Sequence, residues 1–254
     1  MSLRVVQISD THLFADPERE LLEVRTRTGT EAVINHVRSE AGVFDLLVIS
    51  GDLVHEEGDA YQQLVELLGD WLPLCRVIPG NHDKRKPLDE AFPESVSPLE
   101  GCVVFEQKLG DWKLIGLDTL KAGHVEGEID PPQWEWLEGL LAENPDHPTA
   151  IFMHHPAVLI GSGWLDPICL LELERFQQLV KDSPQVKLVS AGHVHQESSV
   201  MIGNVPAYTL PAASVQFAVG TDEFAIGAES PGYRLFDLED DGSFTTQVVR
   251  VPVP

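Results

Sequence analysis

The sequence predicts a layered α/β protein. Apolar stretches of strand length alternate with helix-like patterns from residue 4 to about residue 190, and a run of strand-like segments follows. Apolar residues make up 43% of the 254-residue chain, enough for a large core, and we find neither a linker nor an internal repeat. We therefore expect one domain over residues 1–254.

The charge balance restricts the partners of this protein. Lysine and arginine total 17 against 41 aspartate and glutamate residues, a formal net charge of −24. Such a surface repels nucleic acid and anionic membranes, so we expect neither as a partner. A phosphate-bearing substrate requires a local reversal of sign, which bound divalent metal ions would provide.

The N-terminal residues and the cysteines predict a cytoplasmic protein. No apolar run approaches the length of a membrane span, and the first residues lead into a strand without signal-peptide features. Cys75, Cys102 and Cys169 are odd in number and lack metal-binding or redox spacing. We expect them to be core thiols in a reducing compartment.

Three strands and two helices are expected in the first third of the chain. Short apolar runs predict strands at Arg4–Ser9, Asp45–Ser50 and Leu72–Ile78. Helical patterns predict helices at Thr28–Glu40 and Ala60–Trp71. Each strand is short enough to be fully buried.

The middle of the chain opens with a proline-rich polar stretch at residues 84–101, which predicts an irregular surface loop. A Gly-Asp turn then predicts a hairpin of Cys102–Leu109 and Trp112–Leu117. A helix is expected to begin at Pro131-Pro132, because helices tolerate proline in their first turn. The next buried strand is Thr149–Met153.

The last hundred residues are expected to end in strands. A helix near Leu170–Lys181 precedes the strand Val186–Ser190. An Asp-Asp-Gly turn then separates two further strands, Tyr233–Asp237 and Thr245–Val251.

Candidate metal ligands follow five of these strands directly. They are carboxylate, imidazole and amide side chains: Asp10, His12, Asp52, Asn81, His154, His193 and His195. Such ligands suit manganese, iron and zinc, and the absence of cysteine from the set argues against soft metals. Seven ligands are too many for one tetrahedral ion, but they suit two ions that share a bridging carboxylate.

The distribution of histidines supports this interpretation. Six of the ten follow apolar strands, namely His12, His82, His154, His155, His193 and His195. We expect the other four at the surface, namely His36, His55, His124 and His147. One such block alone would be weak evidence, because Gly51-Asp52, for example, is common turn chemistry. The blocks together, each after an apolar strand, favour a metal centre.

Five blocks resemble those of the calcineurin-like metallophosphoesterases, and the resemblance implies a four-layer αββα sandwich, with two mixed β-sheets flanked by helices. The blocks are Asp10-Thr11-His12, Gly51-Asp52, Gly80-Asn81-His82-Asp83, His154-His155 and Gly192-His193-Val194-His195. Their flanks are similar to one branch, the bacterial class III cyclic-AMP phosphodiesterases, at Asp10–Ala15, Gly163–Asp166, Gly192–Glu197, Val215–Phe217 and Pro231–Arg234.

The resemblance also implies which residues bind two divalent metal ions. One ion would take Asp10, His12, Asp52 and His195. The other would take Asp52, Asn81, His154 and His193, so that Asp52 bridges the two. Iron or manganese is expected, with zinc as an alternative.

The activity implied is hydrolysis of a 3′,5′-cyclic nucleotide, cyclic AMP to 5′-AMP, by a metal-bridging hydroxide. His82 is expected to stabilise or protonate the leaving oxygen, with Asp83 orienting it. The substrate is expected to contact five residues, His12, Asn81, His82, His155 and His195. For His155, support of the metal ligands is an equal alternative.

Several alternatives stay open at this point. The basic stretch Lys84-Arg85-Lys86 is either a solvated turn or a site that steers phosphate. The enzyme could be a phosphodiesterase of broader range, acting on glycerophosphodiesters or 2′,3′-cyclic nucleotides. A non-enzymatic scaffold of the same fold is disfavoured, because His82 and all seven ligands are retained. The sequence allows either a monomer or a homodimer.

Overall fold

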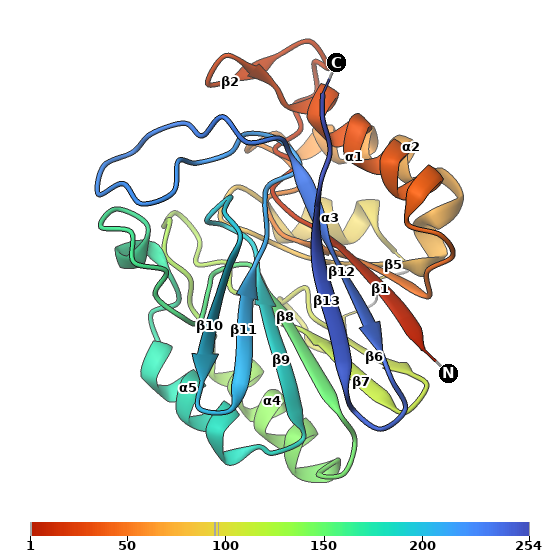
Figure 1. The fold of residues 1–254 in the computed structure, drawn as a ribbon, viewed down its shortest axis with the longest axis vertical. Coiled ribbons are helices and arrows are strands. Elements are labelled where there is room, and N and C mark those ends of the chain that lie inside the picture. The colour runs from red at the N-terminus through yellow and green to blue at the C-terminus, as the bar shows by residue number, and fades with distance from the viewer. Residues whose placement is uncertain (1, 94, 96, 254) are drawn as a thin grey trace.

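Two large mixed sheets pack face to face in the computed structural model, which describes residues 2–93, 95 and 97–253 (Figure 1). The first sheet has five strands in the order β13–β12–β1–β4–β5, namely Phe244–Arg250, Gly232–Leu238, Leu3–Ile8, Leu46–Ser50 and Cys75–Ile78. The second has six strands in the order β10–β11–β9–β8–β7–β6, namely Ser198–Ile202, Val205–Thr209, Val186–Ala191, Thr149–Met153, Trp112–Gly116 and Phe105–Leu109.

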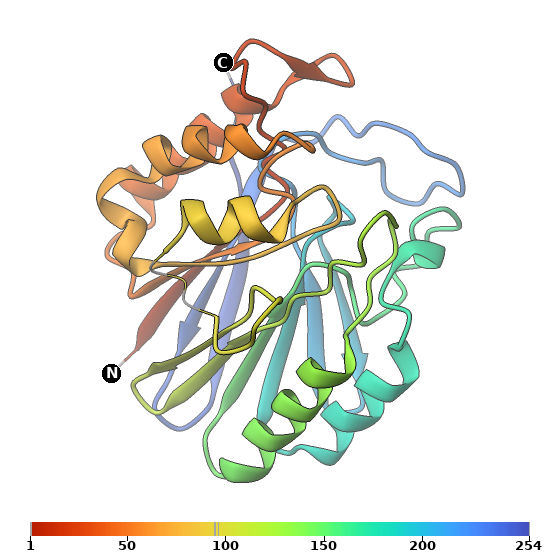
Figure 2. The same ribbon diagram turned by 180° about the vertical axis from the view of Figure 1, so that it is seen from behind.

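Helices cover the outer face of each sheet, as Figures 1 and 2 show from opposite sides. Three pack against the five-stranded sheet: α1 (Thr26–Glu40), α2 (Tyr61–Leu68) and α3 (Arg85–Ala91). Two pack against the six-stranded sheet: α4 (Pro131–Glu143) and α5 (Leu173–Asp182). The four-layer αββα sandwich is therefore confirmed.

The strand β4 illustrates why its sequence is apolar throughout. Leu47 and Ile49 pack into the core beneath α1 and α2, whereas Leu46 and Val48 pack into the core between the two sheets. Alternate side chains of a strand point to opposite faces, so a strand with a hydrophobic layer on both sides needs apolar residues at every position. Burial of each such side chain stabilises the folded state by about 1.5–3 kcal/mol.

The strands that carry the predicted ligands end at the same edge of the sandwich. β1, β4 and β5 run parallel in one sheet, and β8 and β9 run parallel in the other. A buried polar chain joins the sheets near these ends: Ser190 Oγ donates to Gln7 Oε1 over 2.5 Å, and Gln7 Nε2 donates to Ser50 Oγ over 2.8 Å. The loops that follow the five strands are therefore held close together at this edge of the sandwich.

Three predictions of secondary structure between residues 60 and 101 are wrong. The stretch expected to be an irregular loop contains α3, which forms because Leu88 packs into the core. Its proline, Pro87, stands in the first turn, where the backbone N–H has no helical hydrogen bond to lose. The helix expected over Ala60–Trp71 ends at Leu68, because Gly69 has a φ of +53°. A short 3₁₀ helix, Gly69–Leu74, then takes the first residues of the strand expected from Leu72.

The cysteines lie where the sequence suggested, since Cys75, Cys102 and Cys169 are all buried free thiols. Among the helices of the described residues, none combines the length and the apolar character that crossing a bilayer requires.

Candidate metal centre

The loops after β1, β4 and β9 hold their backbones in the left-handed region at five predicted ligands. The φ angle is +56° at Asp10, +44° at His12, +49° at Asp52, +71° at His193 and +49° at His195. This conformation costs a residue with a side chain about 1–2 kcal/mol. Such strain persists only where other interactions fix the chain, and it is concentrated at functional sites.

Backbone hydrogen bonds provide that fixation by joining the loops to one another. Asp10 N donates to Gly51 O over 3.0 Å. His82 N donates to Asp52 Oδ1 over 2.8 Å, and His193 N donates to Asp10 Oδ2 over 3.1 Å. The two carboxylates are thus positioned by amides of neighbouring loops.

Two glycines allow the loops to come this close. A Cβ atom at Gly80 would lie 2.2 Å from Asp52 Oδ1, and one at Gly192 would lie 2.7 Å from Asp10 Oδ2. Both separations are too short for non-bonded atoms, so any side chain there would displace a carboxylate. Glycine is therefore required beside each predicted acidic ligand.

Asp10, His12 and His195 form the first cluster of predicted ligands. His195 Nε2 lies 3.3 Å from Asp10 Oδ1 and 3.2 Å from His12 Nε2. His12 Nε2 lies 3.6 Å from Asp52 Oδ2, and all four side chains are buried. The structure therefore brings together the four side chains expected around one ion.

Asn81, His154 and His193 form the second cluster, which also adjoins Asp52. His154 Nε2 is 3.3 Å from Asp52 Oδ2 and 3.3 Å from Asn81 Oδ1. The ring of His193 packs edge-on against His154, and its buried Nε2 has no hydrogen-bond partner among the described residues. A buried polar atom without a partner costs about 1–3 kcal/mol, and a cation in this cluster would supply the partner. Asp52 Oδ2 thus approaches one histidine of each cluster, His12 and His154, as expected for a shared ligand.

Backbone carbonyls fix the tautomers of two histidines that are predicted ligands. His154 Nδ1 donates to Ser50 O over 2.9 Å, and His195 Nδ1 donates to Val215 O over 2.7 Å. With the proton on Nδ1, the lone pair of Nε2 faces the cluster, which is the arrangement found in histidines that bind metals.

The charges of the site also fit bound cations. Burial would raise the pKa of Asp10, but the charge and hydrogen bond of His195 lower it to about 2. Burial likewise opposes ionisation of Asp52, and His154 nevertheless holds its pKa well below the usual value. Against burial, Asp52 raises the pKa of His154 to about 9, so these carboxylates favour a buried positive charge. A divalent ion would supply that charge in place of the proton.

His82 lies at the mouth of the site and outside both clusters. Its ring contacts that of His12 edge-on, with 5.1 Å between centroids, and its side chain is 28% exposed. Its Nδ1 lies 3.6 Å from Glu56 Oε1. The imidazole is thus beside the predicted ligands and open to solvent.

Asp83 does not have the role that the sequence suggested. Its buried carboxylate accepts hydrogen bonds from Gly80 N over 2.8 Å, Leu53 N over 3.1 Å and the Tyr61 hydroxyl over 2.9 Å. None of the hydrogen bonds described for Asp83 involves the ring of His82, so the prediction that Asp83 orients this imidazole is wrong. Asp83 instead ties the loop after β5 to the loop after β4.

His155 is wholly buried behind the second cluster. Its Nδ1 lies 2.7 Å from Thr119 Oγ1, and its Nε2 donates to Val125 O over 3.0 Å. Its ring packs against that of His193, with 4.6 Å between centroids. Because both ring nitrogens already have partners, His155 is suited to support a ligand and not to contact a substrate.

His55 is the site residue that the sequence analysis missed, since we expected it at the surface. It is half-buried, its ring stacks on that of His82 at 4.4 Å, and its Nδ1 lies 3.3 Å from His12 Nδ1. The sequence signal that could have identified His55 as a site residue was its position three residues after Asp52. In the structure this segment runs beside the loop that carries His12. Of the other histidines expected at the surface, one is exposed and two are half-buried, namely His124, His36 and His147.

The basic stretch after the motif divides into two parts. Arg85 forms a bidentate ion pair with the buried Asp118, at 2.6 and 2.9 Å. Loss of Arg85 would leave that carboxylate unpaired, at a cost of about 3–5 kcal/mol. Lys84 and Lys86 are exposed, and Lys84 Nζ donates to Glu56 O. Only the two lysines are therefore candidates for steering phosphate.

A hollow with about 590 Å³ of empty volume opens over the clusters. Its polar floor consists of predicted ligands together with His55 and His82. The rest of the lining is an aliphatic and aromatic wall that includes Leu21, Leu22, Leu165, Trp164, Val215 and Phe217. The wall adjoins the floor, because the Phe217 ring stacks on that of His195 with 4.1 Å between centroids. A concave site with an apolar wall and a few convergent polar groups is typical of small-molecule binding.

Aromatic rings from two separate segments build that wall. Trp164 contacts Phe217 edge-on at 5.0 Å and Phe224 at 5.3 Å. Ser162 Oγ donates to Thr221 O over 3.1 Å and so joins the two segments. The wall is thus a defined surface, although loops carry it.

Comparison with known proteins agrees with this geometry. A family model described as calcineurin-like phosphoesterase matches residues 3–197. A 3′,5′-cyclic adenosine monophosphate phosphodiesterase CpdA of Vibrio vulnificus is 36% identical, over 98% of this chain and 90% of its own. The protein of that name from Escherichia coli is 33% identical over the same shares.

A solved structure supports the fold at much lower sequence identity. The crystal structure of a dimetal phosphatase from Danio rerio has a TM-score of 0.68 and 16% identity, covering 98% of this chain and 99% of its own. The likeness thus spans the whole sandwich, while the family match covers every predicted ligand. The chain belongs to the calcineurin-like phosphoesterase family.

Proposed function

We propose that this protein is a phosphodiesterase that hydrolyses 3′,5′-cyclic AMP to 5′-AMP with two divalent metal ions. The observation that carries the proposal is the convergence of seven donor side chains from five strand ends, with the other six gathered around Asp52. Relatives whose names state this activity match nearly the whole chain and support the choice of substrate.

In this proposal the two ions are held as the sequence suggested. Asp10, His12 and His195 hold one ion, and three further residues, Asn81, His154 and His193, hold the other, with Asp52 shared. Five of the seven ligands offer nitrogen or an amide oxygen, which favours iron or manganese over magnesium, with zinc as an alternative. Bound ions of this kind polarise phosphoryl oxygens and lower the pKa of a water between them.

The chain's own contribution to the reaction centres on His82. Water adds to phosphorus, the bond from phosphorus to the 3′ oxygen breaks, and that oxygen needs a proton. His82 lies beside the ligands and lines the hollow, so a ring nitrogen can deliver the proton. His12, Asn81 and His195 line the same floor next to the position of the phosphate.

The aromatic wall is the place for the nucleoside in this proposal. Trp164 and Phe217 line the same hollow as the polar floor, and purine bases bind favourably against aromatic side chains. A substrate with its phosphate at the ligands therefore has an apolar surface for its base.

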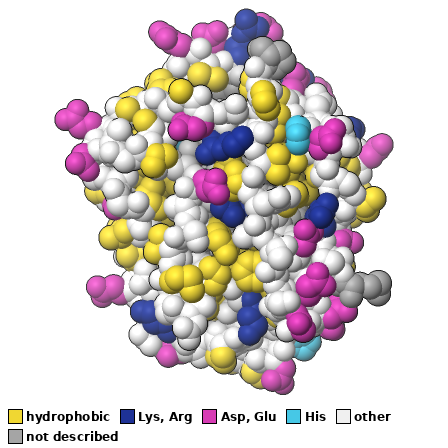
Figure 3. All heavy atoms as spheres, viewed as in Figure 1, with side chains coloured by type: hydrophobic (Ala, Val, Ile, Leu, Met, Phe, Trp, Pro, Cys, Tyr) yellow, Lys and Arg dark blue, Asp and Glu magenta, His cyan; other side chains and the backbone are white. Residues whose placement is uncertain are grey.

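The partners, domain organisation and location that we propose follow from the charge and the composition of the chain. On the face shown in Figure 3, acidic side chains are spread around the outline, and basic ones do not gather into a patch. With a net charge of −24, this favours a small-molecule substrate and no nucleic-acid partner. We further propose a single domain over residues 1–254, a cytoplasmic location, and a monomer or homodimer.

A turnover panel tests the proposed substrate. Cyclic AMP, cyclic GMP, 2′,3′-cyclic AMP, glycerophosphodiesters and bis(p-nitrophenyl) phosphate are compared at equal metal loading. The proposal expects cyclic AMP to have the highest kcat/KM of the natural substrates, and chelation to abolish turnover. Faster hydrolysis of a 2′,3′-cyclic nucleotide or a glycerophosphodiester would establish the broader phosphodiesterase instead. Turnover of none, with two metals bound, would indicate a scaffold.

A further inference from the structure

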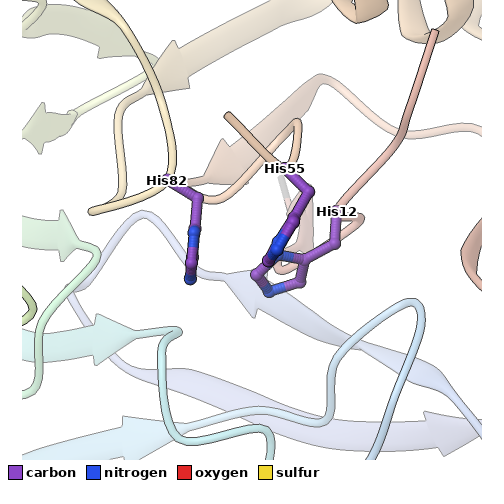
Figure 4. A group of neighbouring side chains, drawn as sticks. All are labelled: His12, His55 and His82. Atoms are coloured by element: carbon purple, nitrogen blue, oxygen red, sulfur yellow. The ribbon is translucent and has the colours of Figure 1, made fainter. Parts of the chain in front are cut away.

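Three histidine rings, those of His12, His55 and His82, meet at the mouth of the metal centre (Figure 4). We propose that His55 is a positioning residue that acts on both neighbours. Its Nδ1 accepts a hydrogen bond from His12 and thereby orients a metal ligand, while the face of its ring supports His82. The inference rests on the proposed function and adds a residue to that site.

The need for such a partner follows from the other ligand histidines. His154 and His195 each donate Nδ1–H to a backbone carbonyl. His12 directs Nε2 toward Asp52, and its Nδ1 lies 3.3 Å from His55 Nδ1. A ring that binds a metal through Nε2 carries its proton on Nδ1, so Nδ1 of His55 must accept. The imidazole of His55 thus accepts from His12 Nδ1 as backbone carbonyls accept from Nδ1 of His154 and His195.

The second contact of His55 is a stack. Its ring lies nearly parallel to that of His82, at an angle of 27° with 4.4 Å between centroids. On another side it contacts the buried Phe14 at 5.2 Å, and the Arg19 guanidinium lies 4.3 Å from the Phe14 ring centroid. His55 is therefore packed in place, and the exposed imidazole of His82 has a fixed surface beside it.

The backbone fixes His55 relative to both neighbouring loops. His55 N donates over 2.9 Å to the carbonyl of Leu13, the residue directly after His12 in the chain. Glu56 N donates to His82 O over 3.1 Å. The segment after β4 thus forms a direct connection between the loop that carries His12 and the loop that carries His82.

The arrangement of the rings argues against a third metal at these histidines, although their nitrogens lie within 4.8 Å of one another. The lone pairs of an imidazole lie in the plane of its ring. The nearly parallel rings of His55 and His82 therefore direct their lone pairs along separate planes and not toward one point. A stacked and hydrogen-bonded group fits the geometry better.

Two substitutions separate the two roles. His55→Phe keeps a ring for the stack and removes the acceptor, whereas His55→Asn keeps an acceptor and removes the ring. We expect His55→Phe to weaken one of the two metal sites by about 10- to 100-fold in a chelator competition. We expect His55→Asn to lower the ratio of kcat on cyclic AMP to kcat on bis(p-nitrophenyl) phosphate by about two- to tenfold, with smaller loss of metal affinity.

His147→Phe and His147→Asn are the matched controls, because His147 precedes β8 at the end of the strand remote from the site. Equal losses of metal affinity in both His55 variants, or unchanged affinity in His55→Phe with its melting temperature intact, would overturn the proposal. So would a third metal equivalent in the wild type that His55→Phe lacks. The metal titration needs no substrate, so it can fail independently of the cyclic AMP assignment.

Discussion

The polar floor and the aromatic wall of the hollow are built in different ways. The floor stands on strand ends, its carboxylates and the histidines of the two clusters are buried, and amides of neighbouring loops fix its carboxylates. The two aromatic residues of the wall, Trp164 and Phe217, stand on two loops joined by the Ser162–Thr221 hydrogen bond, and Phe224, which contacts both rings, is 51% exposed. Rigid placement is what metal binding needs, whereas a loop surface can change shape between substrates.

The contrast predicts how the two regions respond to substitution. Changes at the predicted metal ligands should abolish metal binding or chemistry for every substrate. Changes on the wall should alter the KM of substrates that carry a base and leave the chemistry intact. A ligand substitution that affects only one substrate would contradict this division.

Asp52→Asn should have the largest effect. The amide keeps the size of the side chain and an acceptor for His82 N, but it removes the charge shared by both clusters. We expect the variant to lose at least one of two metal equivalents by elemental analysis, and its activity to fall to background. Asp89→Ala, an exposed carboxylate on α3, is the control. Two tightly held metals in Asp52→Asn would refute the bridging role.

His82→Ala should be next, with metal content near wild type. Its ring lies outside both clusters, so kcat on cyclic AMP should fall by roughly 10²–10⁴, the range for a general acid. A nucleoside 3′ oxygen needs a proton to leave, whereas p-nitrophenolate does not. Activity on bis(p-nitrophenyl) phosphate should therefore fall much less. If both substrates lose equally, His82 positions the phosphate and is not the acid.

These two predictions use residues that the sequence already identified, for a physical reason. Metal ligands belong to a small set of side-chain types, and parallel strands bring their carboxyl ends to one edge of a sheet. Asp10 and His195 could therefore be assigned to one centre from type and position, although they are far apart in the chain. The same logic gave the buried strands, since Asp45–Ser50 differs from β4 by one residue.

Contacts that depend on the direction of a side chain could not be predicted from residue type and position in the sequence. Asp83 follows His82 in sequence, yet its carboxylate turns toward Gly80 and Tyr61. His55 appeared to be a surface residue because no apolar strand directly precedes it. α3 was missed because the apolar residues that anchor it are outnumbered by polar neighbours, and its core contact, Leu88, is visible only in the fold.

Trp164→Ala tests the wall and should have a moderate effect. Loss of one aromatic surface should raise the KM for cyclic AMP about tenfold, because stacking of a base contributes about 1–3 kcal/mol. An abasic analogue, ribose 3′,5′-cyclic phosphate, should show the same KM in variant and wild type. Trp136→Ala on the outer helix α4 is the control. An equal rise for the abasic analogue would mean that Trp164 supports the floor and not the base.

The double substitution Lys84→Met with Lys86→Met should have the smallest effect. Both lysines are exposed in a very acidic chain, and Lys84 lines a hollow together with His82. Arg85 between them pairs with Asp118 and is left unchanged. If the lysines steer phosphate, kcat/KM should fall about twofold at low salt and recover its wild-type value at high salt, because exposed charges are screened within about 10 Å at 0.1 M. Stopped-flow or steady-state rates at several salt concentrations provide the measurement. A loss that is the same at every salt concentration would indicate a local contact with the His82 loop. No loss at all would mean that the two lysines are only solvated residues at the start of α3, which Arg85 anchors.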